Sequence, residues 1–292
     1  MNREPSQSPF GGELPQPRTF EESASLIVPI PFEQTTSYVT GTSRGPHELL
    51  VASAQVELWD EELGVDIHPH GMFTLADIDL GALPIGTAIC ELQKAATELY
   101  RTGKFIVALG GEHSITAPIV AGAAAQYPGL TVLQLDAHAD LRASYLGEPN
   151  SHACAMRRTL EHAPVVQVAI RNISAEEAEA LPSLKTTIFY DWNMRDDPRW
   201  MDRVIDALSD VVYITIDLDG FDPGLVPAVG TPEPGGLSWR EATTLLRRVF
   251  ERRRVIGCDV VELCPIDGMA SSNFIAAKLV YKLLTYKFGL GT

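Results

Sequence analysis

The stretch Leu130-Thr-Val-Leu-Gln-Leu-Asp136-Ala-His138-Ala-Asp140 indicates the kind of fold that this chain adopts. Its first six residues form an apolar run typical of a buried strand, and residues able to do chemistry follow at once. In a strand, side chains at alternate positions point to the same face of the sheet. Asp136, His138 and Asp140 can therefore converge at the carboxyl end of this strand.

Two other segments repeat this arrangement. Gly110-Gly-Glu-His113 follows the apolar run at residues 105–109, and Asp217-Leu-Asp219 follows the run at residues 211–216. Neither Lys nor Arg lies within these runs, and an unpaired buried charge costs several kcal/mol or more. Divalent cations would supply the missing compensation. The predicted ligands are two imidazoles and four carboxylates, namely His113, Asp136, His138, Asp140, Asp217 and Asp219.

For any one segment alone, a hydrogen-bonded core histidine with loop-capping aspartates would be the simpler interpretation. Three such segments together favour a site for two metal ions. Oxygen-rich ligand sets with a few imidazoles suit Mn, Mg or Fe better than zinc. Two such ions about 3.5–4 Å apart bind a water between them and lower its pKa. The predicted reaction class is metal-assisted hydrolysis.

Three residues near these segments are candidates for catalysis. Asp140 is placed to orient the attacking hydroxide. His152, a loop's length further on, suits proton transfer near neutral pH, although a loop histidine can also have no role. Glu262 ends the apolar run that begins at residue 255. It could merely cap a loop, or it could hold a cationic group with both oxygens.

Strand-like runs recur at residues 25–29, 105–110, 130–136, 165–171, 186–191, 211–219 and 255–263, with a weaker one near 64–70. Helical patterns lie between most of them, at residues 45–58, 86–101, 114–126, 175–181, 198–208, 238–251 and 273–285. This alternation predicts an α/β fold with a mostly parallel sheet between two layers of helices. Ligands in such folds bind at the carboxyl ends of strands, where all three polar segments fall. We predict an irregular arm over residues 1–24 and a single catalytic domain over residues 25–292.

Composition limits the possible partners. A formal net charge of −15 argues against nucleic acid, because phosphate binding needs clustered Lys and Arg, and favours cationic ligands. No apolar stretch reaches the roughly 18–20 residues of a membrane helix, and residues 1–19 lack the apolar core of a signal peptide. Four cysteines without a Cys-x-x-Cys motif fit a reducing cytoplasm.

The three motifs Gly-Gly-Glu-His, Asp-Ala-His-Ala-Asp and Asp-Leu-Asp-Gly-Phe-Asp, in this order, resemble those of the ureohydrolase family, which contains arginase, agmatinase and guanidinobutyrase. The resemblance covers about residues 25–287 and implies a three-layer α/β/α sandwich with an eight-stranded parallel sheet. It also implies manganese, with nickel or iron as alternatives, and homo-oligomers, often trimers or hexamers. The implied ligands are His113, Asp136, Asp140 and Asp217 for one ion, and Asp136, His138, Asp217 and Asp219 for the other, with Asp136 and Asp217 bridging.

The same resemblance implies that Asp140 orients the hydroxide, His152 shuttles a proton and Glu262 binds the guanidinium of a small cationic substrate. Thr231 matches the family's loop beside the substrate. Loop similarity favours agmatine, which is hydrolysed to putrescine and urea. Three residues are expected to meet the substrate tail: Glu148 and Glu233 could receive an ammonium, whereas Arg142 could meet a carboxylate.

Several alternatives stay open. The phrase at residues 229–236 also resembles enzymes that act on aminopropylated agmatine, and Arg142 leaves guanidinobutyrate possible. Arginases usually carry Asn at the position of Arg142, which argues against arginase activity. A deacetylase-like amidohydrolase is disfavoured because none of the seven histidines is adjacent to another. A metal-binding protein without catalysis is disfavoured because all the expected catalytic residues are present.

Overall fold

Seven of the apolar runs form strands of one eight-stranded sheet in the computed structural model, which describes residues 3–13 and 18–290. The order across the sheet is β4-β1-β5-β10-β9-β6-β7-β8, and every neighbouring pair is parallel. These seven strands are β1 (Ser25–Ile30), β5 (Phe105–Gly110), β6 (Thr131–Leu135), β7 (Val165–Ile170), β8 (Thr186–Tyr190), β9 (Val211–Asp217) and β10 (Arg254–Val261). The predicted parallel α/β architecture is confirmed.

The eighth strand lies elsewhere than predicted. The weak run at residues 64–70 does not join the main sheet, and the strand β4 (Met72–Thr74) pairs with β1 instead. Val65–Asp66 forms β3, which pairs antiparallel with β2 (Trp59–Asp60). His68–His70 is a 3-10 turn (η2) that contains Pro69. A proline has no N–H to donate to a ladder, so the run cannot continue as a strand through this position.

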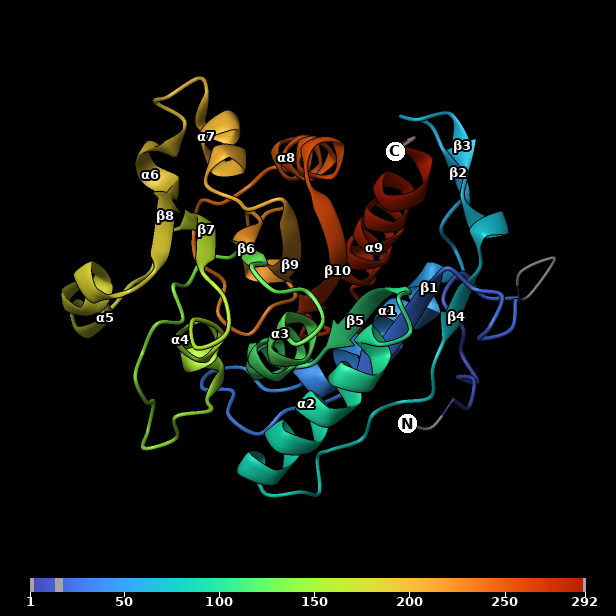
Figure 1. The fold of residues 1–292 in the computed structure, drawn as a ribbon, viewed down its shortest axis with the longest axis horizontal. Helices are drawn as coiled ribbons and strands as arrows, with labels where there is room; N and C mark the ends of the chain where they lie inside the picture. Colours follow the sequence, from blue (N-terminus) through green and yellow to red (C-terminus); the bar gives the residue numbers. More distant parts are fainter. Residues whose placement is uncertain (1–2, 14–17, 291–292) are drawn as a thin grey trace.

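Helices cover both faces of the sheet, which makes three layers (Figure 1). Buried residues of α2, α3 and α4 pack on one face, whereas those of α1, α7, α8 and α9 pack on the other. The α-helices are α1 (Gly45–Ser53), α2 (Ile85–Tyr100), α3 (Thr116–Ala124), α4 (Ala155–Thr159), α5 (Ala175–Ala180), α6 (Asp191–Met194), α7 (Trp200–Asp206), α8 (Trp239–Arg252) and α9 (Ser271–Gly289). The remaining 3-10 turns are η1 (Thr42–Arg44), η3 (His113–Ile115), η4 (His152–Cys154), η5 (Leu181–Ser183) and η6 (Leu218–Gly220).

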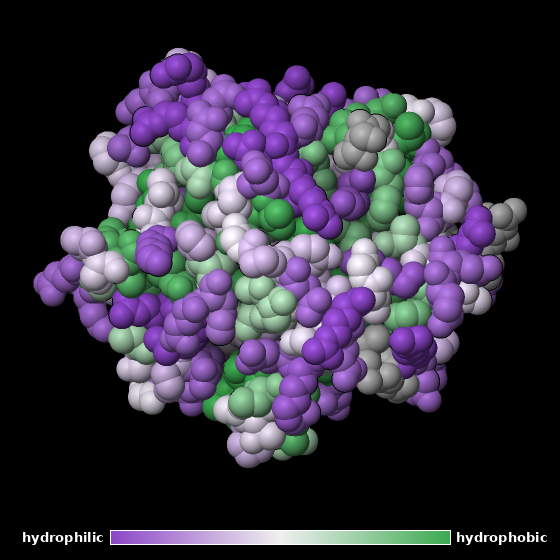
Figure 2. All heavy atoms as spheres, in the orientation of Figure 1, coloured by the Kyte–Doolittle hydropathy of each residue, from purple (hydrophilic) through white to green (hydrophobic). Residues whose placement is uncertain are grey.

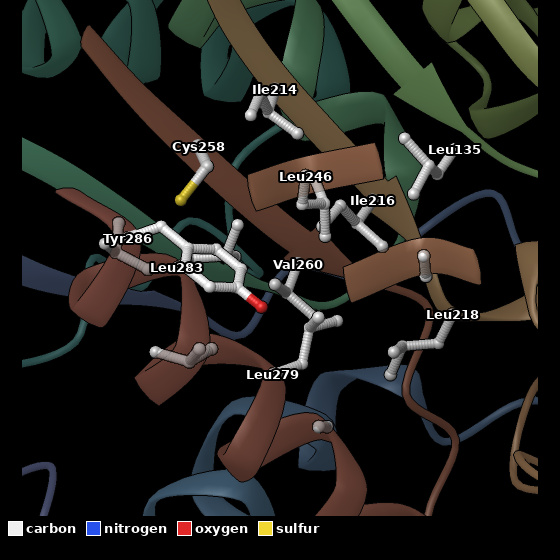
Figure 3. Close-up of a cluster of buried hydrophobic side chains, with 14 of the residues drawn as sticks. Leu135, Ile214, Ile216, Leu218, Leu246, Cys258, Val260, Leu279, Leu283 and Tyr286 are labelled. Carbon is white, nitrogen blue, oxygen red and sulfur yellow. The ribbon is translucent and has the colours of Figure 1, made fainter. Parts of the chain in front are cut away.

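The core between the sheet and its α8–α9 layer is apolar and densely filled. Figure 3 shows Ile214 of β9 and Val260 of β10 beside Leu246 of α8 and Leu279 of α9, and all four side chains are buried. Burying a Val, Leu or Ile side chain contributes about 1.5–3 kcal/mol each. This packing fixes the central strands, and with them the positions of the loops that leave their carboxyl ends.

The described part of the predicted N-terminal arm contains no helix or strand of its own, apart from an isolated bridge at Pro5. It is nevertheless attached to the fold, because Phe10 is buried in the core and its N–H donates to Thr74 Oγ1 at 2.9 Å. The division into arm and domain stays a prediction.

Hydrophilic residues cover most of the face in Figure 2, with smaller apolar groups between them. Within residues 3–13 and 18–290, no helix is both long and apolar enough to cross a membrane.

Candidate metal centre

The six predicted ligands lie together at the carboxyl ends of the central strands. Asp136 follows β6, Asp217 is the last residue of β9, and His113 opens the turn that follows β5. Because β5, β10, β9 and β6 are consecutive neighbours in the sheet, these ends share one edge. The side chains of His113, Asp136, Asp140, Asp217 and Asp219 are buried, which leaves His138 as the partly exposed member.

The first cluster surrounds His113. Its Nδ1 atom lies 3.1 Å from Asp140 Oδ2, 3.2 Å from Asp136 Oδ2 and 3.4 Å from Asp217 Oδ2. Although it is buried and surrounded by carboxylates, Nδ1 makes no hydrogen bond. A buried polar atom without a hydrogen bond is costly, and an ion bound among these atoms would remove that cost. This donor set therefore fits a divalent cation.

The second cluster surrounds His138 and shares Asp136 with the first. His138 Nδ1 lies 2.9 Å from Asp219 Oδ2 and 3.7 Å from Asp136 Oδ1. Two trios, His113–Asp136–Asp140 and Asp136–His138–Asp219, each bring their ligand atoms within 4.8 Å of one another. Asp136 thus lies where it can bridge two ions. Asp217 faces His113 through Oδ2 and accepts a hydrogen bond from the N–H of Asp219 through Oδ1, at 2.9 Å, and its bridging role stays a prediction.

The acidic groups strongly perturb one another. Burial, together with the charge of Asp219, raises the pKa of Asp136 to about 7. Burial and the same neighbour raise the pKa of Asp217 well above its usual range. For Asp219, burial acts upward, but His138 outweighs it and lowers the pKa to about 2. For His138, burial acts downward, but the charge of Asp219 raises the pKa to about 11. Divalent ions would relieve this repulsion.

Hydrogen bonds behind the first cluster fix the orientation of His113. Its Nε2 lies 2.9 Å from Thr215 Oγ1, and that hydroxyl donates to Asp259 Oδ1 at 2.6 Å. Since the Thr215 proton goes to Asp259, Nε2–H must be the donor to Thr215, which leaves the Nδ1 lone pair facing the carboxylates. Such carboxylate-supported histidines are typical of metal sites. Asp259 is fully buried and also accepts from Thr116 at 3.0 Å and Tyr213 at 2.7 Å.

Two predicted functional residues have a left-handed backbone. Asp140 has φ 53° and Glu262 has φ 63°, in a region that residues with side chains rarely adopt. Glu262 is held in place because its N–H donates to the Gly111 carbonyl at 2.8 Å and its Oε1 accepts from the N–H of His113 at 2.7 Å. Burial and the charge of Glu112 raise the pKa of Glu262 well above its usual range. Backbone strain of this kind concentrates at functional sites.

A cavity of about 190 Å³ opens above the clusters. The structure brings five of the predicted catalytic and substrate residues into its wall: Asp140, Arg142, His152, Thr231 and Glu262. Thr231 Oγ1 also lies 3.4 Å from Asp219 Oδ2, to which it donates. The guanidinium of Arg142 lies over the ring of Tyr145, 5.3 Å from its centroid.

Glu148 and Glu233, the two predicted receivers of an ammonium, are not part of this wall. Glu148 Oε1 accepts from the N–H of Asn150 at 2.8 Å and so shapes its own loop. Glu233 Oε1 accepts from Asn172 Nδ2 at 2.5 Å and lies 3.9 Å from His138 Nε2. The Glu233 carboxylate is therefore already hydrogen-bonded beside the second cluster.

The sequence interpretation missed one side of the cavity. Thr36, Ser37, Tyr38 and Val39, from the loop after β1, line it together with Asn172. A signal was available, because the polar residues 33–37 follow an apolar strand in the same way as the metal segments do. The loop was missed because none of its four residues that line the cavity is a typical metal ligand.

Proteins similar to this chain identify its family. The chain is 43% identical over 276 residues to an N(1)-aminopropylagmatine ureohydrolase of Synechocystis sp., covering 92% of this chain and 90% of the relative. It is 31% identical to an agmatinase of Bacillus anthracis, covering 91% and 92% respectively. The solved agmatine ureohydrolase of Thermoplasma volcanium superposes with a TM-score of 0.84 at 30% identity, covering 93% of this chain and 92% of that one. The model of the Arginase family matches residues 23–285, and the chain therefore belongs to the arginase family of ureohydrolases.

Proposed function

We propose that this protein hydrolyses the guanidinium of N1-aminopropylagmatine and releases urea. Sequence interpretation favoured agmatine and kept the aminopropyl compound as an alternative. The relatives reverse that order, because the one at 43% identity is named for the aminopropyl compound, whereas the agmatinase stands at 31%.

The observation that carries hydrolysis of a guanidinium is the cavity itself. Two clusters of acidic ligands that share Asp136 lie at its base, and Glu262 lies in its wall. A carboxylate can bind a guanidinium with two parallel hydrogen bonds, so Glu262 supplies the recognition that all guanidino substrates share. Divalent ions bound by the six ligands would supply Lewis-acid activation of a water.

The wall away from the clusters favours a long, partly apolar tail. Within the described residues, the acids that line the cavity are Asp140, Asp217, Asp219 and Glu262, which belong to the clusters or to guanidinium recognition. The apolar part of the wall includes Tyr38, Val39 and Tyr145, and Tyr38 is 78% exposed. A methylene chain can pass along these side chains towards solvent, and aromatic faces attract ammonium groups. A tail with a second amine can reach further than agmatine along this path.

The chain's own residues supply the remaining steps. The reaction adds water to the guanidinium carbon, breaks its bond to the tail nitrogen, and places the water oxygen in urea. The tail nitrogen must gain a proton as it leaves, and His152, in the same cavity, can deliver that proton. Asp140 lies in the wall beside His113 and can orient the attacking water.

One observation favours a second candidate, a guanidino acid such as guanidinobutyrate. Arg142 lines the cavity and carries a permanent positive charge that suits a carboxylate. Against this, its guanidinium already lies over the ring of Tyr145, where a cation is stabilised without any anion. We therefore rank the guanidino acid second.

A urea-release assay on N1-aminopropylagmatine, agmatine, guanidinobutyrate and arginine tests the proposal. We expect the highest kcat/KM for the aminopropyl compound, with Arg142→Met leaving this order unchanged. A preference for guanidinobutyrate that Arg142→Met abolishes would establish the second candidate. A higher kcat/KM for agmatine than for its aminopropyl derivative would overturn the tail argument and leave the hydrolytic site intact.

We further infer that the ions are manganese and that the protein works as a homo-oligomer in the cytoplasm. Oxygen-rich sites with imidazoles accept Mn²⁺, Fe²⁺ and Ni²⁺, so metal analysis of protein purified without added metal decides among them. Light scattering after size-exclusion chromatography gives the number of chains and tests the expectation of a trimer or hexamer.

A further inference from the structure

Glu112, in the Gly-Gly-Glu-His motif, has no part in the chemistry described so far. Its side chain is fully buried, and four donors from the protein satisfy it. Oε2 accepts from the backbone N–H of Gln34 at 2.7 Å and of Thr35 at 2.6 Å. Oε1 accepts from Thr35 Oγ1 at 2.7 Å and Ser114 Oγ at 2.6 Å. Four donors converging on one carboxyl group is the pattern of an ionised carboxylate.

These bonds attach the loop after β1 to the end of β5. The N–H of Gly111 donates to the Ile30 carbonyl at 3.0 Å, and the N–H of Glu112 donates to the Phe32 carbonyl at 2.9 Å. A Cβ atom at position 111 would collide with the Phe32 carbonyl oxygen, which explains why glycine stands there. The loop is therefore fixed against the strand that leads to His113.

Thr35 connects this loop to His152. Its hydroxyl has one proton and two acceptor positions, and the proton goes to Glu112. The oxygen then accepts from the backbone N–H of His152 at 2.9 Å, and His152 Nδ1 lies 3.2 Å away. Because the hydroxyl has no second proton, this contact is a hydrogen bond when Nδ1 carries the hydrogen. The Ser151 hydroxyl also lies 3.3 Å from Nδ1 and, free to rotate, can accept from the same N–H.

This arrangement determines which nitrogen of His152 faces the cavity. With the proton on Nδ1, the lone pair of the neutral ring is on Nε2, where the Ser37 hydroxyl can donate to it, and protonated His152 carries its transferable proton there. Nε2 lies 3.4 Å from Ser37 Oγ, and both residues line the cavity. The ring of Tyr145 meets the imidazole edge to face, with centroids 5.9 Å apart. The ring is thus held from two sides.

We propose that Thr35 and Glu112 are positioning residues that hold His152 in the Nδ1–H tautomer, with Nε2 directed at the leaving nitrogen. This inference rests on the proposed proton-transfer role of His152. Glu112 determines the direction of the Thr35 proton, and Thr35 transmits that choice to the imidazole. The Gly-Gly-Glu-His motif therefore serves both ends of the reaction, with His113 at the metal cluster and Glu112 behind the proton carrier.

Steady-state kinetics of Thr35→Val, Thr35→Ser and His152→Ala, with the best substrate of the panel, test this inference. Valine keeps the shape of threonine but has no hydroxyl, whereas serine keeps the hydroxyl. Misplacing a catalytic group can cost about 100-fold in rate, so we expect kcat of Thr35→Val to fall by about 10- to 100-fold. KM and metal content should change little, and Thr35→Ser should recover most of kcat.

The double variant Thr35→Val/His152→Ala separates positioning from a purely structural role. If Thr35 acts through His152, the double variant has the kcat of His152→Ala alone. Multiplied losses, or full activity of Thr35→Val, would overturn the inference. If His152→Ala itself keeps full kcat, the proton-transfer role fails first, and that result is distinct from a failure of Thr35.

A measurement independent of turnover covers the case in which Thr35→Val fails to fold. Nitrogen-15 chemical shifts of the His152 ring, in the unmodified protein loaded with Mg²⁺, distinguish the two neutral tautomers. We expect the Nδ1–H form. Observation of the Nε2–H form at a pH where the ring is neutral would overturn the inference without any variant.

Discussion

The hydrogen bonds behind His113 allow a sharp test of the metal centre by comparing Thr215→Val with Thr116→Val. Both threonines donate to Asp259, and both substitutions replace a hydroxyl with a methyl group of similar size. Of the two hydroxyls, that of Thr215 also contacts the His113 side chain, through Nε2 at 2.9 Å, whereas Thr116 meets His113 through its backbone N–H, which the substitution leaves in place. Thr116→Val is therefore the matched control: like Thr215→Val it removes one hydrogen bond to Asp259, but it leaves the hydrogen bond to the His113 ring in place.

The expected magnitudes follow from the partners that remain. In Thr116→Val, Asp259 Oδ2 still accepts from Tyr213, so the loss is one hydrogen bond to a carboxylate, about 1.5–3 kcal/mol of stability. In Thr215→Val, Asp259 Oδ1 and His113 Nε2–H both lose the Thr215 hydroxyl as a partner. Each buried polar group left unpaired costs about 1–3 kcal/mol of stability. Loss of an outer hydrogen bond to a metal-binding histidine typically lowers metal affinity by about 10- to 100-fold.

Chelator-competition titrations with Mn²⁺ measure the affinity, and thermal unfolding of the metal-free variants measures the stability. We expect Thr215→Val to lose about 10- to 100-fold in affinity for at least one ion, with Thr116→Val close to the unmodified protein. Equal affinities in the two variants would show that the Thr215 connection does not orient His113, and the argument for the ligand geometry would then be refuted.

Four further outcomes are expected. Metal analysis after manganese loading should find about two ions per chain. A metal content no higher than background would contradict a two-metal site. Asp136→Asn and Asp217→Asn should each weaken the binding of both ions and abolish turnover. Full activity of either variant at modest manganese concentration would contradict the assignment of that residue as a bridging ligand. His152→Ala should lower kcat by about 10²–10⁴-fold without loss of metal, and a fall in metal content would instead make His152 a ligand. The metal-free protein should lose stability as pH rises, because the pKa of Asp136 is raised from 3.8 to about 7 and that of His138 from 6.5 to about 11. Both groups hold their proton more tightly in the folded state, so the free energy of unfolding falls between about pH 4 and 7 through Asp136 and then towards pH 11 through His138. A melting temperature in EDTA that rises from pH 5 to pH 8 would contradict this.

Much of the fold and of the ligand set was readable in the sequence because it depends on local periodicity. The alternation of side chains in a strand predicts that Asp136, His138 and Asp140 converge, whatever the neighbouring strands are. Alternating strands and helices likewise predict a parallel sheet, whose carboxyl edge gathers the ligands. The sheet confirms the parallel architecture, with its eighth strand misplaced near Pro69. Asp136, His138 and Asp140 do lie close together, but β6 ends at Leu135, so the loop after the strand, in which Asp140 has φ 53°, brings them together instead of strand alternation.

The order of the strands, which no local pattern specifies, was settled by the tertiary structure. Because β1 lies beside β5, the loop at residues 31–41 reaches the cavity and Thr35 meets both Glu112 and His152. Glu148 and Glu233 were predicted from their loops to receive an ammonium, but neither lines the cavity. Glu148 accepts from the N–H of Asn150 in its own loop, and Glu233 accepts from Asn172, which does line the cavity, so their role towards a substrate stays a prediction. Loop side chains such as Thr35 and Glu233 take their positions from partners distant in sequence. The sequence therefore determined the chemistry at the base of the site, whereas the packed sheet decided which residues surround the cavity.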